Sequence, residues 1–490
     1  MADLAFLIES DNWDKPPSLA SPAKPTRILV LGAGMAGLVA GYELMNQGYD
    51  VRIFEARATA GGRVQTLREG FTDGVYADAG ATFIPDAHGL PSYYAGLLKL
   101  SLVDFSGSDL PGIYYVKGQK ILYPAGSGTP VDWPYALTAT EKAMGLEKMQ
   151  NTYGSPPDLL GSPKGGSTDV VRLQVEDAVS LNAYMTSKGA SVGAVELLNV
   201  GFNQLMGEGP SSYSAAVSLS GDHYLSSNIQ NGAPDIKRVE GGNDLLPAAL
   251  AAKLGSRISY STEVVQIAQD ESGVRVTCQA KDGQHVASAD YVICTLPFSV
   301  LRNIPVIPAF GAALAQALQT VSYTSVTRIF LQMREQFWRT QGQSGKILSD
   351  QSMTVVYPGY NPASQQGTLG LYMASANARR IGALSLDEQI EFALGQIEPV
   401  YPEVRQNFVA GVSKVWDADP FSKGAYAWFT PGQMGSLVAV MATPQGRIYF
   451  AGDHASTLTG WIQGAMASGL RAAQNIAATA SQKQAAAYPG

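Results

Sequence analysis

The chain is poor in cysteine, in charge and in long apolar runs. Its two cysteines among 490 residues, Cys278 and Cys294, both lie in apolar strand-like stretches, so we expect buried thiols and no disulfide. Only 15% of residues are charged and the net charge is -7, so no basic surface for nucleic acid or anionic lipid is expected. No run of about 18 apolar residues and no secretory signal are visible. We therefore expect a soluble, cytoplasmic protein that binds neither membrane nor nucleic acid.

Histidine is also scarce. The four histidines show no spacing typical of a metal site, and we predict no metal centre. A surface or packing role is the default expectation for each of them. No Ser/His/Asp or Cys/His arrangement has supporting context. The four are His88, His223, His285 and His454.

Glycine, by contrast, is abundant, and six residues near the N-terminus, 32–37, match the pattern G-x-G-x-x-G. An apolar strand, Arg27–Leu31, precedes the pattern, and helical spacing follows over residues 35–47, with Gly48 as a stop. A second strand covers residues 51–54. This strand, turn, helix and strand predict the βαβ opening of an α/β dinucleotide-binding fold.

Each glycine of this pattern has a physical reason. Gly32 allows the tight turn, Gly34 lets a pyrophosphate approach the backbone, and Gly37 lets helix and strand pack closely. Met35 and Ala36 lie at the start of the helix, whose free N–H groups face the phosphates. The carboxylate of Glu55 follows the second strand, about 20 residues on, where it can accept hydrogen bonds from ribose hydroxyls.

Two further segments have glycines beside charged or aromatic residues. Glu55-Ala56-Arg57 runs into Gly61-Gly62-Arg63, a second loop that supplies phosphate-facing N–H groups and cations. Near the C-terminus, a strand over residues 448–451 is followed by Gly452 and Asp453. Gly460, Trp461 and Ile462 then lead into a helix over residues 464–480, with a fraying end expected after residue 473.

The region between these segments is less legible. Periodicity predicts helices over residues 138–149, 174–188 and 245–253, and a Gly/Ser/Pro-rich loop over 154–167. Strands are predicted over 257–260, 264–268, 274–279 and 291–295. Three more, over 326–333, 353–357 and 367–373, suggest a separate sheet.

These motifs resemble the flavin amine oxidase family, which includes monoamine, polyamine and L-amino acid oxidases, and the likeness to the L-amino acid oxidases is greatest. It extends with gaps over residues 27–477 and is weakest over 105–235. It implies a discontinuous Rossmann-like FAD-binding domain (26–100, 236–303 and 440–490) and an inserted α+β substrate-binding domain (101–134 and 304–439). We also expect a helical domain (135–235) and an N-terminal arm (1–25). The protein is expected to form a homodimer or a higher homo-oligomer.

The resemblance also implies how FAD is held. Backbone groups at Val264 would meet the adenine, and Asp453 the ribityl or pyrophosphate region. Monoamine oxidases carry a flavin-bonded cysteine at the place of Ala425, so we expect non-covalent FAD. The expected cofactor-binding residues are Gly32, Gly34, Met35, Ala36, Gly37, Glu55, Ala56, Arg57, Gly61, Gly62, Arg63, Ala81, Thr82, Val264, Gly452, Asp453, Trp461 and Ile462.

The same resemblance implies a chamber in which the substrate amine lies between the rings of Trp461 and Tyr426. Gly460, next to Trp461, would also border the substrate. Tyr357 matches a tyrosine that donates to the substrate carboxylate. Two positions depart from the family: Phe83 stands where many L-amino acid oxidases have a carboxylate-binding arginine, and Arg328 stands where the family has a lysine that holds a water. Our hypothesis is that Arg328 binds the carboxylate bidentately, and the alternative is that it only replaces that lysine.

The implied reaction is oxidative deamination of an L-amino acid by FAD and molecular oxygen, giving a 2-oxo acid, ammonia and hydrogen peroxide. Arg328, Trp461, Tyr426 and Tyr357 are the expected catalytic residues. Two alternatives stay open: an oxidase of primary amines or polyamines without a carboxylate, and an amino acid dehydrogenase that uses another acceptor. A protein that binds FAD or NAD for regulation is a third, although both aromatic walls of a chamber are retained.

Overall fold

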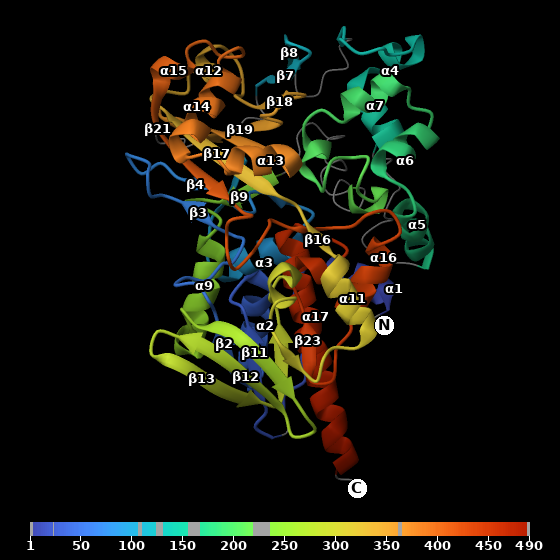
Figure 1. Cartoon of the computed structure of the whole chain (residues 1–490), viewed down its shortest axis with the longest axis vertical. Coiled ribbons are helices and arrows are strands. Elements are labelled where there is room, and N and C mark those ends of the chain that lie inside the picture. Colours follow the sequence, from blue (N-terminus) through green and yellow to red (C-terminus); the bar gives the residue numbers. More distant parts are fainter. Residues whose placement is uncertain are drawn as a thin grey trace.

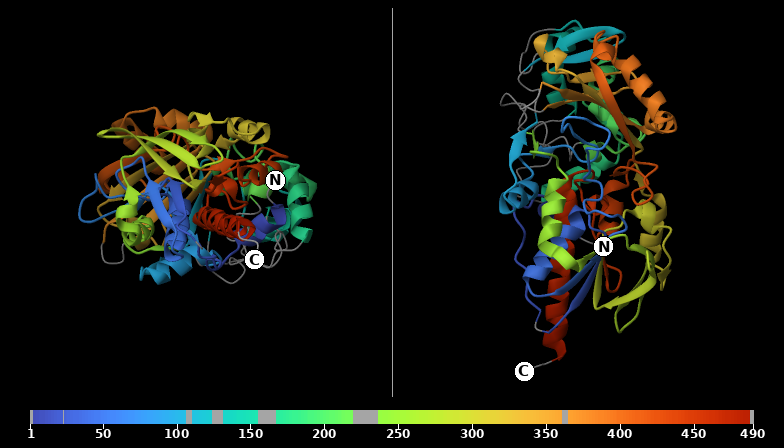
Figure 2. Two further views of the ribbon diagram at one scale, coloured as in Figure 1. Left: turned by 90° about the horizontal axis from the view of Figure 1, so that it is seen from below. Right: turned by 90° about the vertical axis from the view of Figure 1, so that its left-hand side faces the viewer.

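The computed structural model describes residues 3–22, 24–105, 110–123, 131–154, 167–218, 236–360 and 365–487. The molecule is elongated, and its lower half holds helices α2 (Met35–Asn46) and α17 (Ile462–Ala487) together with a parallel sheet (Figures 1 and 2). Its upper half has a seven-stranded sheet on one side and a group of helices on the other (Figure 1).

The parallel sheet in the lower half is assembled from segments far apart in the chain. Its order is β10-β2-β1-β14-β23, and every neighbouring pair is parallel. Such a sheet is buried on both faces, which explains the continuous apolar runs of its strands. The predicted strands near 27, 51, 257, 291 and 448 are thereby confirmed, whereas the domain boundaries stay a prediction. The strand bounds are β1 Arg27–Leu31, β2 Asp50–Phe54, β10 Ile258–Ser259, β14 Tyr291–Cys294 and β23 Ile448–Phe450.

Helix α2 begins after Gly34 and stops before Gly48, whose φ of 92° ends it as predicted. Helix α17 packs along α2 (Figure 1). The expected fraying after residue 473 is wrong, because α17 continues to Ala487 and Ile476 and Ala480 are buried.

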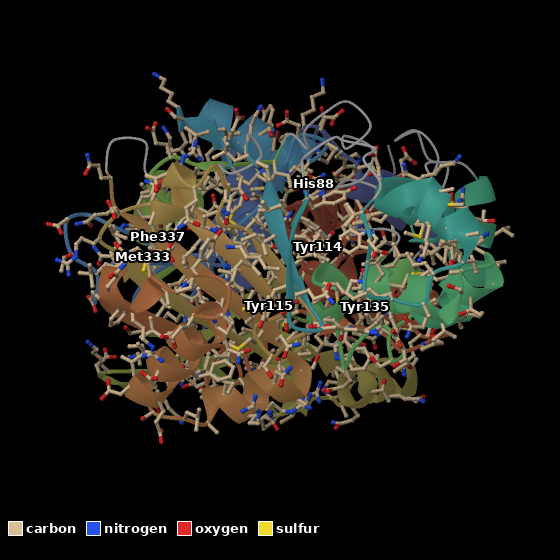
Figure 3. All side chains as sticks on the ribbon, turned by 90° about the horizontal axis from the view of Figure 1, so that it is seen from above. His88, Tyr114, Tyr115, Tyr135, Met333 and Phe337 are labelled. Carbon is tan, nitrogen blue, oxygen red and sulfur yellow. The ribbon has the colours of Figure 1, made fainter. Side chains whose placement is uncertain are left out.

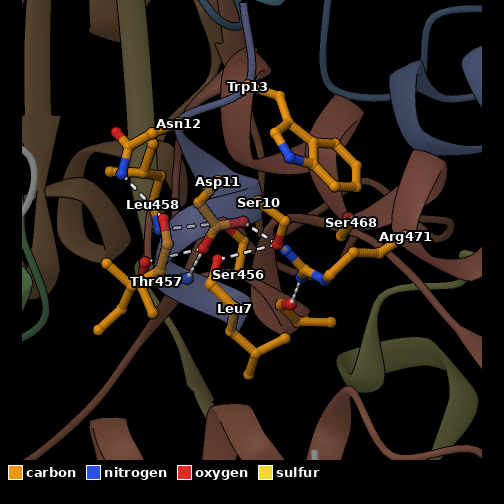
Figure 4. A network of polar contacts seen from close by, with 12 residues as sticks. Leu7, Ser10, Asp11, Asn12, Trp13, Ser456, Thr457, Leu458, Ser468 and Arg471 are labelled. Carbon is orange, nitrogen blue, oxygen red and sulfur yellow. Dashed lines mark hydrogen bonds and ion pairs between the residues drawn. The ribbon is translucent and has the colours of Figure 1, made fainter. Parts of the chain in front are cut away.

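The expected N-terminal arm contains a helix, α1 (Leu4–Asp11), that packs against α17. Its last residue, Asp11, is buried and forms an ion pair with Arg471 of α17 (Figure 4). Thr457 donates to the other carboxylate oxygen of Asp11 through both its backbone N–H and its hydroxyl. The first residues of the chain are therefore part of the packing beneath the loop at 452–461.

Two further sheets lie beside the parallel one. The four-stranded sheet has the order β13-β12-β11-β15, and the three-stranded sheet has the order β5-β9-β6. The predicted strands at 264 and 274 are confirmed as β11 and β12, and β13 was not predicted. Helix α9 (Leu245–Leu254) confirms the helix predicted at 245. The bounds are β5 Ile84–Pro85, β6 Leu102–Asp104, β9 Ile236–Val239, β11 Glu263–Gln269, β12 Val274–Ala280, β13 Gly283–Ala289 and β15 Val306–Ile307.

The upper sheet has the order β21-β17-β20-β19-β18-β7-β8, which confirms the separate sheet. One face packs against helices α12–α15 through a core that includes Ile329, Val356 and Leu371. The opposite face carries Arg328, Tyr357 and other side chains toward the lower half. The bounds are β7 Gly112–Val116, β8 Gln119–Tyr123, β17 Val326–Met333, β18 Ile347–Ser349, β19 Val355–Tyr360, β20 Gly367–Ala374, β21 Phe408–Val415, α12 Phe337–Thr340, α13 Ser375–Gly382, α14 Leu386–Ile397 and α15 Val404–Asn407.

The helical part of the upper half contains α4 (Ala139–Met149), α5 (Ser167–Asp177), α6 (Leu181–Ser187) and α7 (Val192–Leu198). The single helix predicted over 174–188 is wrong, because Ser180 caps a new helix by accepting a hydrogen bond from the N–H of Ala183. The predicted loop at 154–167 lies mostly outside the described residues. In Figure 3, Met333 and Phe337 lie in the sheet part and Tyr135 lies beside these helices, with Tyr114 between them.

Shorter elements connect these layers. They are β3 Thr66–Leu67, β4 Ala77–Asp78, β16 Ser322–Tyr323, β22 Ala427–Trp428, α3 Gly89–Leu97, α10 Phe298–Leu301, α11 Ala312–Thr320, α16 Met434–Met441, η1 Gln150–Gly154, η2 Phe202–Leu205, η4 Gly255–Arg257 and η5 Asp453–Ala455. Both cysteines are buried and unbridged, as predicted. Within the described ranges, no helix combines the length and apolarity that crossing a bilayer requires.

Candidate active site

One large cavity, of about 950 Å³, runs between the two halves of the molecule. Its lining begins at the glycine turn after β1 and ends at the face of the upper sheet. All the site residues predicted from the sequence line this cavity except Gly37 and Arg328. The fold therefore brings together segments from residue 32 to residue 465, while the role of each residue stays a prediction.

The glycine turn closes against the second glycine loop. The N–H of Gly61 donates to the carbonyl of Ala33, and Gly34 forms a bridge with Gly61. A Cβ at Gly37 would lie 2.0 Å from the carbonyl oxygen of Gly32, so only glycine fits at this position. Gly37 packs against the turn and not against the cavity, and it is therefore not a lining residue. At Gly34 a Cβ would meet nothing within 4 Å, so the N-terminus of α2 faces open space.

Glu55 lies at the end of β2 and is buried. One carboxylate oxygen accepts from the N–H of Ala33 and the other from the N–H of Arg57. Glu55 thus ties the glycine turn to the loop that follows β2. The Arg57 guanidinium donates to Asp419 at 2.5 Å and to Ser422 at 3.0 Å, which holds it at one edge of the cavity.

Arg63 and Asp453 link the N-terminal and C-terminal parts of the site. Arg63 donates to Asp453 at 2.5 Å and to the carbonyl of Ala425 at 2.8 Å. Burial raises the pKa of Asp453, but the Arg63 cation and the hydrogen bonds from Arg63 and Gly460 together lower it, so the pKa lies below its usual value. Asp453 therefore stays ionised and also accepts from the N–H of Gly460.

The cavity reaches strand β11 at Val264. The register between β11 and β12 shifts between Val264 and Gln266, as in a β-bulge. A bulge leaves backbone groups of the extra residue unpaired. Val265 therefore offers main-chain N–H and C=O groups beside Val264, which suits the adenine contact that the resemblance implies.

Aromatic side chains line the upper end of the cavity. The Tyr426 hydroxyl donates to the carbonyl of Leu205 and accepts from the hydroxyl of Tyr372 at 3.1 Å. A Cβ at Gly460 would lie 3.4 Å from the Tyr426 ring, so backbone packs closely against that ring. Trp461 is packed edge-to-face by His88, with ring centroids 5.0 Å apart. These contacts hold both predicted walls of the chamber in place.

Phe83 and Tyr357 lie together at this end. Their ring centroids are 5.1 Å apart, and Phe105 and Phe202 lie 5.9 and 5.8 Å from Tyr357. The Tyr357 hydroxyl is buried and has no hydrogen-bond partner in the described part of the chain. Burial raises the pKa of Tyr357 well above 10, so the hydroxyl keeps its proton and is a free donor.

Arg328 lies behind the lining, not in it. Its Nη1 donates to the carbonyls of Asp78 and Gly80 and to the Thr82 hydroxyl. Its guanidinium carbon lies 4.9 Å from the Phe330 ring centroid and 4.7 Å from that of Tyr372. This geometry favours a role in holding the loop 78–82 over the hypothesis that Arg328 binds a carboxylate.

The lining residues that the sequence analysis missed include Tyr372, Phe105, Phe202 and Lys346. Tyr372 could have been noticed, because it alternates with Gly370 along a predicted strand. Phe105 and Phe202 lie where the resemblance is poorest, and Lys346 precedes β18 with no motif around it. Only packing places these side chains in the chamber.

The three described histidines take packing or surface roles, as expected. His285 pairs with Asp282 on the surface. Burial lowers the pKa of His88 to about 3 and that of His454 to about 4, so both are neutral. His454 does not line the cavity, and His223 lies outside the described residues.

A family model for flavin containing amine oxidoreductases matches residues 35–477. The chain belongs to the flavin-containing amine oxidoreductase family. This oxidoreductase is 31% identical over 469 residues to a protein of Bacillus subtilis (strain 168) that is provisionally named an L-amino-acid oxidase, covering 94% of this chain and 96% of that protein. It is also 31% identical over 468 residues to the L-amino-acid oxidase of Demansia vestigiata, covering 94% and 88%.

Solved structures share the fold of this oxidoreductase. Cyclohexylamine oxidase from Brevibacterium oxydans superposes with a TM-score of 0.74 at 23% identity, covering 94% of this chain and 100% of that one. A putrescine oxidase bound to putrescine gives 0.74 at 22% identity, covering 94% and 99%. The expected Rossmann-like α/β fold is thereby confirmed, and membership of the family implies a flavin cofactor.

Proposed function

We propose that this flavin oxidoreductase catalyses oxidative deamination of L-amino acids by molecular oxygen, with FAD as the cofactor. The observation that carries the proposal is one cavity that joins a dinucleotide-binding turn to an aromatic chamber. The buried Tyr357 hydroxyl lines that chamber and has no hydrogen-bond partner among the described residues. Relatives named L-amino-acid oxidases over nearly the whole chain support it.

The residues present suit FAD. Gly34 opens onto the cavity at the start of α2, where N–H groups can receive a pyrophosphate. Glu55 lies at the end of β2, at the place for a ribose, and the bulge at Val265 offers backbone groups to an adenine. At the other end, Asp453, Trp461 and Ile462 would border the isoalloxazine and ribityl parts.

Attachment of the FAD is non-covalent in this proposal. Ala425 lines the cavity and offers no nucleophile, and both cysteines lie in strands of the core. Acid precipitation of the purified protein should release a yellow supernatant with the absorbance of free FAD. A yellow pellet with a colourless supernatant would rule out non-covalent attachment.

A bound flavin supplies the acceptor for a hydride from the carbon beside the amine, and oxygen takes up the two electrons as hydrogen peroxide. The chain's own residues position the substrate and exclude water. Tyr426 and Trp461 would flank the neutral amine, and Tyr357 would donate to an oxygen of the substrate. Water then adds to the released imine, which yields ammonia and the 2-oxo acid.

A second candidate is an oxidase of amines that lack a carboxylate. Phe83 favours it, because an apolar ring stands where a carboxylate-binding arginine is expected. The proteins of similar fold are named for cyclohexylamine and putrescine. A third candidate, an amino acid dehydrogenase, would have the same chamber and a different electron acceptor.

One experiment separates the three. The purified holoprotein is given L-amino acids, D-amino acids and simple amines in air, and hydrogen peroxide is measured. Peroxide from L-amino acids alone supports the proposal, and peroxide from amines alone favours the second candidate. Bleaching of the flavin by L-amino acids without oxygen uptake in air, but with reduction of a dye, would favour the dehydrogenase. The oligomeric state and cellular location stay predictions.

A further inference from the structure

Lys346 contributes an unpaired cation to the chamber. It precedes β18 and lines the cavity. Within the described part of the chain its Nζ has no hydrogen-bond or ion-pair partner, and its contact is the Phe202 ring, 5.1 Å from Nζ to the centroid. The other cations of the lining differ: Arg57 pairs with Asp419, Arg63 pairs with Asp453, and Lys423 is exposed.

Sheet register places Lys346 next to Tyr357. Ile347 pairs with Val356 in the antiparallel ladder, so Lys346 and Tyr357 form the next pair and point to the same face. Phe202 contacts both side chains. An ammonium and a buried hydroxyl with no partner thus lie side by side in one cavity.

An unpaired charge in an enclosed site is unfavourable, because it loses hydration without gaining a counter-ion. Burial lowers the pKa of Lys346 to about 8, and no carboxylate offsets that effect. A structural cation in this position would be expected to have an acidic partner. Together, Lys346 and Tyr357 present three ammonium N–H donors and one O–H donor, which is the complement of a carboxylate.

We propose that Lys346 determines substrate specificity by binding a carboxylate of the substrate, together with the Tyr357 hydroxyl. This inference rests on the proposed oxidation of amines at the Tyr426 end of the same chamber. Tyr372 lies on β20, Tyr357 lies on the next strand, β19, and Lys346 directly precedes β18. Because Tyr372 pairs with Val355, two residues from Tyr357, Lys346 is roughly 12 Å from Tyr372 across the sheet. The carboxylate is either the α-carboxylate, reached by the four-carbon lysine stem, or a side-chain carboxylate.

Substrate pairs that differ in one carboxylate distinguish these two sources. L-Glutamate and L-glutamine differ only in the side-chain charge, and 5-aminopentanoate and pentylamine differ in a carboxylate remote from the amine. L-Norleucine and pentylamine differ in the α-carboxylate. The enzymes to compare are the wild type, Lys346→Met, Lys346→Arg and the exposed-lysine control Lys253→Met.

The expected result is that Lys346→Met raises KM for the carboxylate-bearing member of the responsible pair about 10- to 100-fold. It should leave kcat and the KM of the uncharged member nearly unchanged, and Lys346→Arg should restore much of the affinity. If KM rises for L-glutamate but not for L-glutamine, Lys346 binds the side-chain carboxylate. If KM rises for L-norleucine but not for pentylamine, Lys346 binds the α-carboxylate. Equal effects on both members of every pair would overturn the proposal.

A binding measurement keeps the test independent of turnover. The holoprotein is titrated calorimetrically with α-methyl-L-glutamate and α-methyl-L-norleucine, which have no α-hydrogen to transfer. Lys346→Met should bind at least one of these ligands more weakly than the wild type does. The thermal midpoint of Lys346→Met should equal or exceed that of the wild type, because an apolar side chain replaces an unpaired charge. A lower midpoint together with unchanged ligand binding would show a structural role.

Failure of the proposed function has a different signature. If no L-amino acid is oxidised but 5-aminopentanoate and pentylamine are, the activity proposal fails while that pair still tests Lys346. If L-amino acids are oxidised and Lys346→Met changes no pair selectively, only the inference about Lys346 fails.

Discussion

The Oδ1 atom of Asp11 lies 2.6 Å from Nη1 of Arg471, although 460 residues separate them in the chain. Both side chains are buried, and Arg471 also donates to Ser10 and to the carbonyl of Ala455 (Figure 4). The first helix thereby contacts the segment that carries the predicted flavin-binding residues at 452–462. This contact makes the N-terminal segment part of the folded site.

Replacing Asp11 should destabilise the protein. Asp11→Asn leaves the buried Arg471 cation without a counter-charge, and we expect a loss of about 3 kcal/mol in the free energy of unfolding. Glu9→Gln is the control, since Glu9 lies on the same helix and is exposed. Urea unfolding of both variants checks this, and equal midpoints for Asp11→Asn and wild type would contradict it.

A methyl group at Gly37 should abolish flavin binding. It would lie 2.0 Å from the Gly32 carbonyl, which is rigid backbone, so the turn must open. In the control Gly41→Ala, on the same helix, the methyl group lies 2.8 Å from the end of the Ile53 side chain and 3.5 Å from Val51, and it meets no backbone atom among these nearest neighbours. The ratio of flavin to protein absorbance should fall well below that of wild type for Gly37→Ala and stay near it for Gly41→Ala.

Removing the Tyr357 hydroxyl should affect binding without affecting folding. Tyr357→Phe is expected to raise KM about tenfold for carboxylate-bearing substrates, because a hydrogen bond to a charged group is lost. Stability should hardly change, since the hydroxyl has no partner in the described part of the protein. Tyr401→Phe is the control: its hydroxyl is also buried without a partner, but it belongs to the core behind the upper sheet. A rise in KM for both variants would contradict the assignment.

Replacing Arg328 should lower kcat/KM for all substrates by a similar factor. Arg328→Met leaves the carbonyls of Asp78 and Gly80 and the Thr82 hydroxyl without their donor. We expect lower thermal stability and a similar loss of kcat/KM for substrates with and without a carboxylate. A KM increase confined to the carboxylate-bearing substrates would instead restore the hypothesis that Arg328 binds the carboxylate.

The affinity for carboxylate ligands should fall as pH rises through about 8. The pKa of Lys346 is lowered to about 8 by burial, so its ammonium is present below that pH and is lost above it. Burial raises the pKa values of Tyr357 and of Tyr114, which pairs with Leu348 from the adjoining strand β7, so both tyrosines stay neutral. Calorimetric titration with α-methyl-L-glutamate and α-methyl-L-norleucine between pH 7 and 9.5 should show a steep loss of affinity for at least one ligand in wild type. The same ligand should show a much flatter profile with Lys346→Arg, and parallel profiles for both enzymes would contradict the prediction.

The cofactor end of the site could be predicted from the sequence because its chemistry is local. A glycine turn, a helix N-terminus and a carboxylate after the next strand are consecutive in the chain, and each requires a particular residue type. The same holds for residues 452–462, where backbone and small side chains make the contacts. In these segments, the local backbone geometry permits few residue types at each position.

The substrate end could not be predicted in the same way. Phe105, Phe202, Lys346 and Tyr372 come from different elements, and nothing in their local sequence separates them from core or surface residues. Arg328 shows the limit clearly: its position in a strand was predicted, but packing turns its guanidinium toward the loop at 78–82. The break at Ser180 was missed because a cap depends on one hydrogen bond that hydrophobic periodicity does not register.

The sequence by itself determined the α/β fold, the flavin amine oxidoreductase family and the segments that approach the cofactor, because these depend on backbone freedom and hydrophobic pattern along the chain. Tertiary structure alone decided which side chains face the substrate. It placed Lys346 opposite Tyr357 of the neighbouring strand, placed Arg328 behind the cavity wall and joined Asp11 to Arg471. These are long-range contacts, and sheet register and packing, rather than local propensity, select them.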